Sequence, residues 1–186
     1  MDWSSRIAEY LHLGPDSTGQ RGGLLAALGT SAQSAVERYL GRTLDVQEYT
    51  ESYDGTGKDT LSLRHDPIVS VSALSVCGSP LTVGDPAAPA FPPEPVEIEG
   101  PYLIRTDGGT FLAGRRTVTV TYRAGYEIPP PAIVQACVDW AALLFKDRDR
   151  VGLSSENVGG QSFGITHDVP KRIKETLEPW RRVYVP

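Results

Sequence analysis

The hydrophobic pattern of this chain of 186 residues changes its period twice. Up to about residue 43, and again from residue 129, apolar residues recur every three or four positions, as on one face of an α-helix. From residue 44 to residue 128 short alternating runs take over, rich in β-branched and aromatic residues. A continuous block of strands between helices excludes the strand–helix alternation that builds parallel nucleotide-binding sheets. We therefore predict an α+β fold, in which a helical bundle carries an antiparallel β-rich subdomain inserted between its second and third main helices.

The length of the chain fits one domain, since domains commonly have about 100–200 residues. We predict a single domain over residues 1–186, with helical parts at 1–43 and 129–186 and a β-rich insert at 44–128. The two cysteines, Cys77 and Cys137, lack CxxC spacing and have apolar neighbours. This is typical of buried thiols in a reducing compartment, and a disulfide between them is not expected.

Two helices are predicted before the insert. Asp2 to Ser5 offer N-cap residues for a short first helix. The second helix has a clear apolar face, and Gly41 is placed to cap its C-terminus. That face consists of Leu25, Leu28, Ala32, Val36 and Leu40.

The third main helix is predicted to begin at three prolines, Pro129 to Pro131. Its apolar residues leave little polar face, so we expect it to be buried in the core or partly against a neighbouring subunit. These residues are Ile133, Val134, Cys137, Val138, Trp140, Ala141, Leu143, Leu144 and Phe145. The basic residues Lys146, Arg148 and Arg150 near its end would complement the helix dipole.

The clearest strand of the insert places Val118, Val120 and Tyr122 on one face and threonines on the other. This alternation predicts a half-buried antiparallel strand. Asp54-Gly55 and residues 107–109 are predicted to form hairpin turns. Residues 152–166, rich in glycine and serine, are predicted to be a loop.

Proline collects in residues 86–95, which we predict to form an exposed loop because no central strand could contain them. Acidic residues are numerous in this region, as at Glu94, Glu97 and Glu99, and alternating glutamates are typical of the solvated face of a strand.

The charge of the chain limits its partners. A formal net charge of −5 and a pI near 5.2 argue against broad, sequence-independent DNA binding, which depends on phosphate neutralisation by lysine and arginine. No apolar run approaches the roughly 18 residues of a membrane helix. We expect a soluble protein that does not enter a membrane.

Motifs that could carry chemistry lack the required context. Gly160 to Gly164 match the GxSxG pattern around Ser162, and His167 follows closely. A nucleophile elbow needs a strand before the serine, a helix after it and a parallel sheet beneath, which this region does not predict. A serine hydrolase using Ser162 and His167 is therefore kept only as an alternative.

Phosphate and metal sites are not indicated either. Gly57-Lys58 lacks the GxxxxGK[ST] spacing and is predicted to lie between two strands. The histidines His12, His65 and His167 are scattered, and the cysteines are not clustered. We expect no enzyme activity, and no catalytic, cofactor-binding or metal-binding residue is assigned.

The end of the chain allows two interpretations. A last helix is predicted to begin at Asp168 and Pro170 and to be interrupted by Pro179. The closing sequence WRRVYVP has the composition of a partner-binding anchor, since Trp, Tyr and Arg dominate interface hot spots. It could equally fold back on its own core. The candidate partner-binding residues are Trp180, Arg181, Arg182 and Tyr184.

Four segments, in this order and spacing, carry a resemblance to a known family. They are AVERYLGR (residues 35–42), YTESYDGTGKDTLSLRHDPIVSVSAL (49–74), VTVTYRAGYEIPPPAIVQACVDWAALLFKDRD (118–149) and SFGITHDVPKRIKETLEPWRRV (162–183). The chain resembles the head–tail connector (adaptor, head-completion) proteins of tailed bacteriophages and related prophages. Each segment is weak alone, and none supplies a catalytic residue.

The resemblance implies a structural virion protein. Such a protein forms a homo-oligomeric ring, a dodecamer in the assembled virion, beneath the phage portal protein. It extends the channel through which packaged DNA passes without sequence-specific binding. It also offers a docking surface to a head-completion (stopper) protein or to a tail protein. Its expected location is the head–tail interface of the virion, and the host cytoplasm during assembly.

One further structural role stays open beside this one and the hydrolase. The chain could be another ring component of the virion, a stopper or a tail terminator, which would bind the tail tube or the connector instead of the portal. The sequence does not separate these roles.

Overall fold

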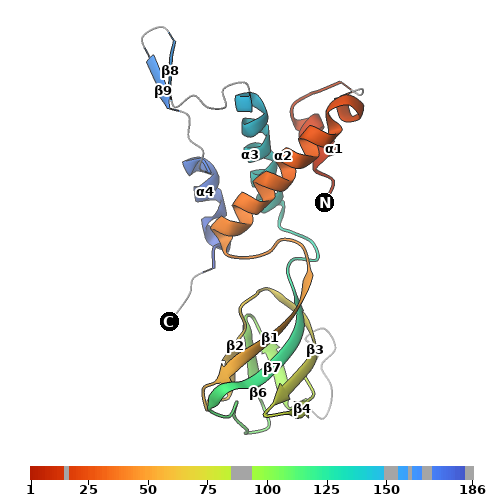
Figure 1. Cartoon of the computed structure of the whole chain (residues 1–186), viewed down its shortest axis with the longest axis vertical. Helices are drawn as coiled ribbons and strands as arrows, with labels where there is room; N and C mark the ends of the chain where they lie inside the picture. The colour runs from red at the N-terminus through yellow and green to blue at the C-terminus, as the bar shows by residue number, and fades with distance from the viewer. Residues whose placement is uncertain (15–16, 85–93, 149–154, 159–160, 165–168, 183–186) are drawn as a thin grey trace. The chain divides into compact units, whose positions relative to one another are not determined.

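The computed structural model describes residues 1–14, 17–84, 94–148, 155–158, 161–164 and 169–182, with the backbone alone at 17–20, 155–158 and 161–164. Within these ranges the chain has four α-helices and antiparallel sheets, so the predicted α+β fold is confirmed (Figure 1). It divides into two compact units. The helical unit comprises residues 1–41 and 129–186, and the β unit comprises residues 42–128. That both act together as one connector domain stays a prediction.

The helical unit begins with α1 (Trp3–Tyr10) and α2 (Ser17–Leu40), which pack against each other (Figure 1). The predicted cap of α1 is confirmed, because the Asp2 carboxylate accepts a hydrogen bond from the Ser5 N–H at 3.3 Å. Gly41 ends α2 with a φ of 67°, and its N–H donates to the carbonyl of Glu37. The predicted apolar face of α2 is also confirmed, with Leu28 half-buried and the other four residues fully buried: Leu25, Ala32, Val36 and Leu40.

Helix α3 (Pro131–Asp147) packs against α1, α2 and α4. It begins with Pro131 at its first position, as predicted. Its predicted burial is confirmed on most sides, although Leu143 is 38% exposed. The Arg148 guanidinium donates to the Phe145 carbonyl at 2.6 Å and lies 4.2 Å from the centre of the Phe145 ring. The predicted role of the basic cluster at the helix end is confirmed for Arg148, while Arg150 lies outside the described residues.

Helix α4 (Lys171–Leu177) continues into a short 3₁₀ helix, η2 (Glu178–Trp180). Pro179 lies in the first turn of η2, so the predicted interruption is confirmed. The predicted start is wrong by one residue, because Pro170 is the N-cap of α4 and not a helical position. Asp168 lies outside the described residues.

The described residues of the β unit form seven strands in two sheets (Figure 1). The first sheet has the order β1-β7-β3-β4 and the second has the order β2-β6-β5. Their bounds are β1 (Gln47–Gly55), β2 (Thr60–Ser62), β3 (Ile68–Val76), β4 (Ser79–Leu81), β5 (Val96–Glu99), β6 (Tyr102–Arg105) and β7 (Gly114–Ala124). All pairs are antiparallel, and the long strand β7 lies between β1 and β3.

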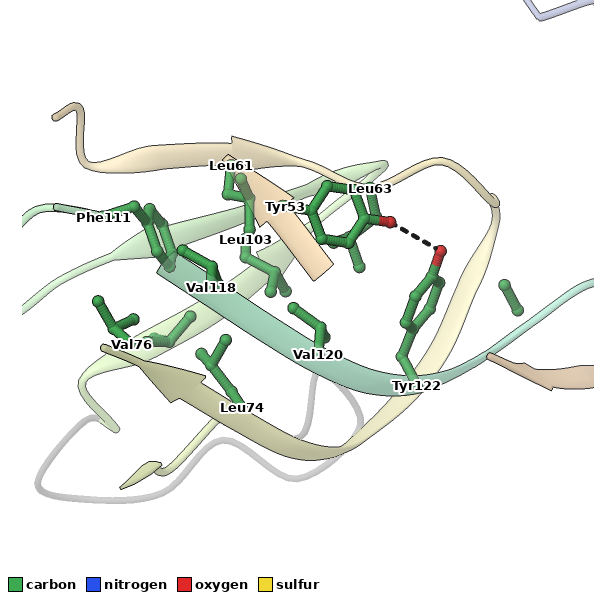
Figure 2. Close-up of a cluster of buried hydrophobic side chains, with 12 residues drawn as sticks. Tyr53, Leu61, Leu63, Leu74, Val76, Leu103, Phe111, Val118, Val120 and Tyr122 are labelled. Carbon is green, nitrogen blue, oxygen red and sulfur yellow. Dashed lines mark hydrogen bonds between the residues drawn. The ribbon is translucent and has the colours of Figure 1, made fainter. Parts of the chain in front are cut away.

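The core of the β unit lies between these sheets (Figure 2). As predicted, Val118, Val120 and Tyr122 of β7 point into it and are fully buried. The other members come from β1, β2, β3, β5, β6, the end of β7 and the segments after β2 and before β7: Tyr53, Leu61, Leu63, Leu74, Val76, Val96, Leu103, Phe111 and Ala124. Burial of this cluster is the main stabilising contribution within the unit, at about 25 cal/mol per Å² of apolar surface.

The prediction of a hairpin turn at Asp54-Gly55 is wrong. Both residues belong to β1, where a bulge between Tyr53 and Gly55 brings Gly55 opposite Gly114. A Cβ on Gly55 would lie only 1.9 Å from the carbonyl oxygen of Leu112. The glycine therefore allows a close backbone approach and does not reverse the chain.

The turn at residues 107–109 exists, but it is not a hairpin. It follows β6 and leads toward β7, and these two strands lie in different sheets. The Asp107 carboxylate accepts the Gly109 N–H at 2.9 Å and also binds Arg105, while Gly108 has a φ of 75°. Asp107 thus stabilises the turn through its side chain.

Three other predictions have different outcomes. The loop predicted for residues 152–166 is wrong in part, because β8 (Ser155–Val158) and β9 (Gln161–Gly164) form a two-stranded antiparallel sheet. The prediction of a buried thiol is wrong for Cys77, which is exposed at a φ of 51° beside Gly78, and confirmed for Cys137; both are free thiols. Most of the proline-rich segment 86–95 lies outside the described residues.

Candidate functional site

The structure offers Ser162 no nucleophile elbow. Ser162 lies inside β9, opposite Asn157 of β8, in an antiparallel pair. A nucleophile elbow places the serine at a sharp turn between a strand of a parallel sheet and a helix. His167, its suggested partner, lies outside the described residues.

Within the described ranges, no group of three or more His, Cys, Asp or Glu side chains is placed to hold a metal ion. His12 belongs to the helical unit and His65 to the β unit. Among the helices of the described residues, none is long and apolar enough to cross a membrane.

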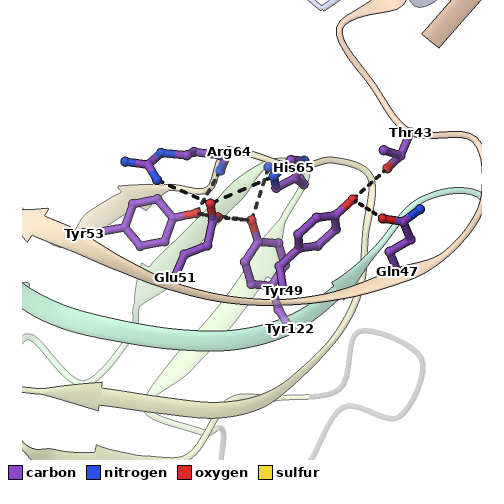
Figure 3. A network of polar contacts seen from close by, with 8 residues as sticks. All are labelled: Thr43, Gln47, Tyr49, Glu51, Tyr53, Arg64, His65 and Tyr122. Atoms are coloured by element: carbon purple, nitrogen blue, oxygen red, sulfur yellow. Dashed lines mark hydrogen bonds and ion pairs between the residues drawn. The ribbon is translucent and has the colours of Figure 1, made fainter. Parts of the chain in front are cut away.

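One polar network stands out in the β unit, centred on the carboxylate of Glu51 (Figure 3). The hydroxyls of Tyr53 and Tyr122 both donate to its Oε2, the latter at 2.7 Å. Arg64 Nη1 donates to Oε1 at 3.3 Å, and His65 Nε2 lies 3.9 Å from the same oxygen. A carboxylate at the rim of an apolar core is therefore satisfied from several sides.

The same two tyrosines fix the backbone between β2 and β3. The Tyr53 hydroxyl accepts the Arg64 N–H at 3.0 Å, and the Tyr122 hydroxyl accepts the His65 N–H at 3.2 Å. The His65 ring stacks on Tyr49, with ring centres 3.8 Å apart. The network thus joins β1, β7 and the β2–β3 connection.

Sequence reasoning missed this network. Its signal was present, since Tyr49, Glu51 and Tyr53 alternate along one strand and so share one face. An acidic residue between two aromatics on an inward face is rarely left without partners.

The network shifts the pKa values of its members. Burial alone would raise the pKa of Glu51, but the hydrogen bonds from Tyr53 and Tyr122, the charge of His65 and the Arg64 bond together lower it below its usual value. Burial, together with the hydrogen bond to Glu51, raises the pKa of Tyr53 to about 12. Burial likewise raises the pKa of Tyr122.

These shifts predict how the stability of the β unit depends on pH. A raised pKa stabilises the folded state below the unfolded value of 10.0 and loses that effect as the pH rises toward about 12. We expect Tyr53→Phe to reduce the loss of stability between pH 10 and pH 12. At neutral pH the same change should cost about 1–3 kcal/mol, because the Arg64 N–H and Glu51 each lose a partner.

The measurement is urea unfolding at a series of pH values, followed by far-UV circular dichroism. Tyr102→Phe is the matched control, because Tyr102 is an exposed tyrosine of the same unit. Equal alkaline profiles for wild type and Tyr53→Phe would contradict the assignment.

The structure brings two of the four candidate partner-binding residues, Arg181 and Arg182, to the C-terminal end of α2. The Arg182 N–H donates to the Leu40 carbonyl at 2.8 Å. The Arg181 guanidinium lies 5.4 Å from the centre of the Tyr39 ring, and Trp180 is half-buried. Tyr184 lies outside the described residues. The role of these residues in partner binding stays a prediction.

A family model described as "Head completion protein" matches residues 7–183, which is nearly the whole chain. The chain belongs to the head completion protein family. The suspected kinship with head–tail connector and head-completion proteins is thereby confirmed. No match was found among curated proteins.

Solved structures with a similar fold come from gene transfer agent (GTA) particles. A chain in the neck of the empty particle, computed with C6 symmetry, is 17% identical with a TM-score of 0.57 and covers 88% of this chain and 80% of that chain. One in the neck of the native particle, computed with C12 symmetry, is 18% identical with a TM-score of 0.57 over 92% and 90%. A third, from the virion of the native particle, is 17% identical with a TM-score of 0.58 over 100% and 91%.

At these identities the likeness shows a shared fold. The family match assigns this head completion protein a structural role at the junction of head and tail in a phage-like particle. Such a role needs surfaces that bind other proteins.

Proposed function

We propose that this head completion protein forms a ring beneath the portal, connects the head to the tail and extends the DNA channel. The observation that carries the proposal is the family match over residues 7–183. The solved chains of similar fold support it, because they were found in necks computed with C6 and C12 symmetry. A dodecamer agrees with the twelvefold case.

The charge of the chain is consistent with a channel. Each subunit has a formal net charge of −5, so a ring multiplies an excess of carboxylates. Many lysine or arginine contacts around a ring would hold the passing duplex through its phosphates. A ring with few such contacts lets DNA pass without sequence-specific binding.

Native mass spectrometry of the full chain, with and without purified cognate portal rings, tests this function. The expected result is a complex of portal with a ring of this protein, which then binds a stopper or tail protein. A stable monomer without affinity for the portal would contradict the proposal. Binding to tail tube in place of portal would assign the protein to the stopper or tail-terminator class.

The candidate partner-binding residues make a separate prediction. Ending the chain after Leu177 removes Trp180, Arg181, Arg182 and Tyr184, and we expect portal binding to be lost. Because this truncation also removes the bond from Arg182 to Leu40, circular dichroism must show that the helical unit still folds. The substitution Arg181→Glu, at an exposed side chain, should weaken portal binding without that structural change. Unchanged affinity in both variants would exclude these residues from the portal contact.

A further inference from the structure

An open polar groove runs along β1, the outer strand of the first sheet. Three of its lining residues are basic, namely Arg64, Arg115 and Arg116. The strand supplies the others, among them Glu51, Tyr53 and Asp54. Among the described strands β1 pairs with β7 alone, so its other edge has no strand partner in the described part of the chain. An unpaired strand edge is a common place for another chain to bind.

The acidic residues that line this groove do not neutralise all of its arginines. Glu51 is already bound by Tyr53, Tyr122 and Arg64, as described above. Within the described part of the chain, the side chains of Arg115 and Arg116 form no ion pair. These two arginines therefore leave a local positive charge on a chain that is acidic as a whole.

The backbone holds one of these arginines in place. Arg116 has a φ of 52°, a conformation that costs free energy in a residue other than glycine. Its N–H donates to the Asp54 carboxylate at 2.7 Å, which fixes the start of β7 against β1. The Asp54 carboxylate therefore binds the backbone N–H of Arg116 and not the guanidinium of that residue.

A complementary surface lies on the other sheet of the same unit. Strand β5 is the outer strand of the β2-β6-β5 sheet, and its residues Glu97 and Glu99 are exposed. They are two positions apart in a strand, so both carboxylates lie on one face, about 7 Å apart along the chain. The chain therefore presents a basic groove and an acidic strand as two different patches.

We propose that the groove along β1 binds the acidic face of β5 from a second copy of this chain. Two different patches that match each other produce a head-to-tail contact, and repeated contacts of this kind form a ring when the rotation between subunits closes. Arg115 and Arg116 meet Glu97 and Glu99 of the neighbouring subunit. This proposal rests on the ring-forming function above and identifies one contact within that ring.

Charge reversal tests the contact through two variants of the full chain. The groove variant is R115E/R116E, and the strand variant is E97R/E99R. Each alone places like charges at every subunit contact, so we expect about tenfold or greater weakening of ring assembly on portal at low salt. The single variant R115E repeats the test without altering the strained Arg116.

Mixing the variants gives the decisive result. In an equimolar mixture the reversed groove of one variant faces the reversed strand of the other, and the two remaining native patches face each other. Alternating rings should therefore form, with an even number of subunits in native mass spectra. The quadruple variant should also assemble by itself. Lys58→Glu and Glu127→Arg reverse exposed charges outside both patches and should leave assembly unchanged.

The outcomes separate this proposal from the ring function itself. If the wild-type chain forms no ring, the proposed function fails. If it forms a ring and either variant alone assembles equally well, or the mixture is not rescued, this contact is excluded and the ring function stands. A groove variant that assembles normally but loses affinity for DNA would likewise overturn the contact and assign the arginines to nucleic acid.

Discussion

Replacing Phe111 by alanine is expected to lower the free energy of unfolding of the β unit by about 3–5 kcal/mol. Phe111 is fully buried against the core between the two sheets, although it lies in the connection before β7 (Figure 2). Its backbone also bonds in both directions, with its N–H donating to Lys58 O and its carbonyl accepting the Gly57 N–H. The mutation leaves these bonds in place and removes the ring, so the measured loss reports the apolar contact and the cavity.

The next residue supplies the control. Leu112 is 55% exposed, and Leu112→Ala should change the free energy of unfolding by no more than about 0.5 kcal/mol. Equal losses for the two variants would show that Phe111 is not part of the core.

The tryptophans allow the two units to be followed separately. All three tryptophans, Trp3, Trp140 and Trp180, belong to the helical unit. Their fluorescence therefore reports that unit, while hydrogen exchange at β-strand amides reports the β unit. Phe111→Ala should speed exchange in β7 at a denaturant concentration that leaves the tryptophan signal of the helical unit unchanged.

The sequence predicted those elements whose period is long and unbroken. Helix α2 repeats its apolar residues over most of its length, and β7 alternates from Val118 to Tyr122, so burial on one face determined both. Such patterns report how an element meets a core. They carry no information on which strand pairs with which.

The wrong predictions concern features that depend on contacts between residues far apart in the sequence or on strands too short to show a period. Asp54-Gly55 has the composition of a turn, but the glycine is required by the approach of the Leu112 backbone, a contact between distant residues. Strands β8 and β9 have four residues each, too few for a period to be recognised. The Glu51 network depends on Tyr122, which is 71 positions away along the chain.

The candidate interaction sites could be predicted from the sequence even less well than the fold. Composition singled out the closing tryptophan and arginines, but nothing in the sequence places Arg182 against the end of α2. The basic groove combines Arg64 with Arg115 and Arg116, which come together only when β1, β7 and the β2–β3 connection are assembled. A surface formed by pairing of strands needs the pairing to be known first.

Gly29 in the middle of α2 makes the other prediction with a large effect. A Cβ at this position would lie 2.3 Å from the Cβ of Trp3 and 3.2 Å from Cδ1 of Ile7. Trp3 is held there, since it is buried and its Nε1 donates to Gln33 Oε1 at 2.9 Å. Gly29→Ala must therefore displace α1, and we expect it to destabilise the helical unit by about 1–3 kcal/mol through overpacking.

The same substitution at a second glycine of this helix, Gly23, should have the opposite effect on stability. Apart from the adjacent residues and the backbone of its own helix, nothing lies within 4 Å of a Cβ built on Gly23. Gly23→Ala should therefore stabilise the helix by about 0.5–1 kcal/mol, because alanine has the lower backbone entropy in the unfolded chain. Urea unfolding followed by tryptophan fluorescence measures both variants, and emission from Trp3 should change in Gly29→Ala alone. If both alanines stabilised the unit, helix propensity would outweigh the contact, and α1 would not be held against α2 through Gly29.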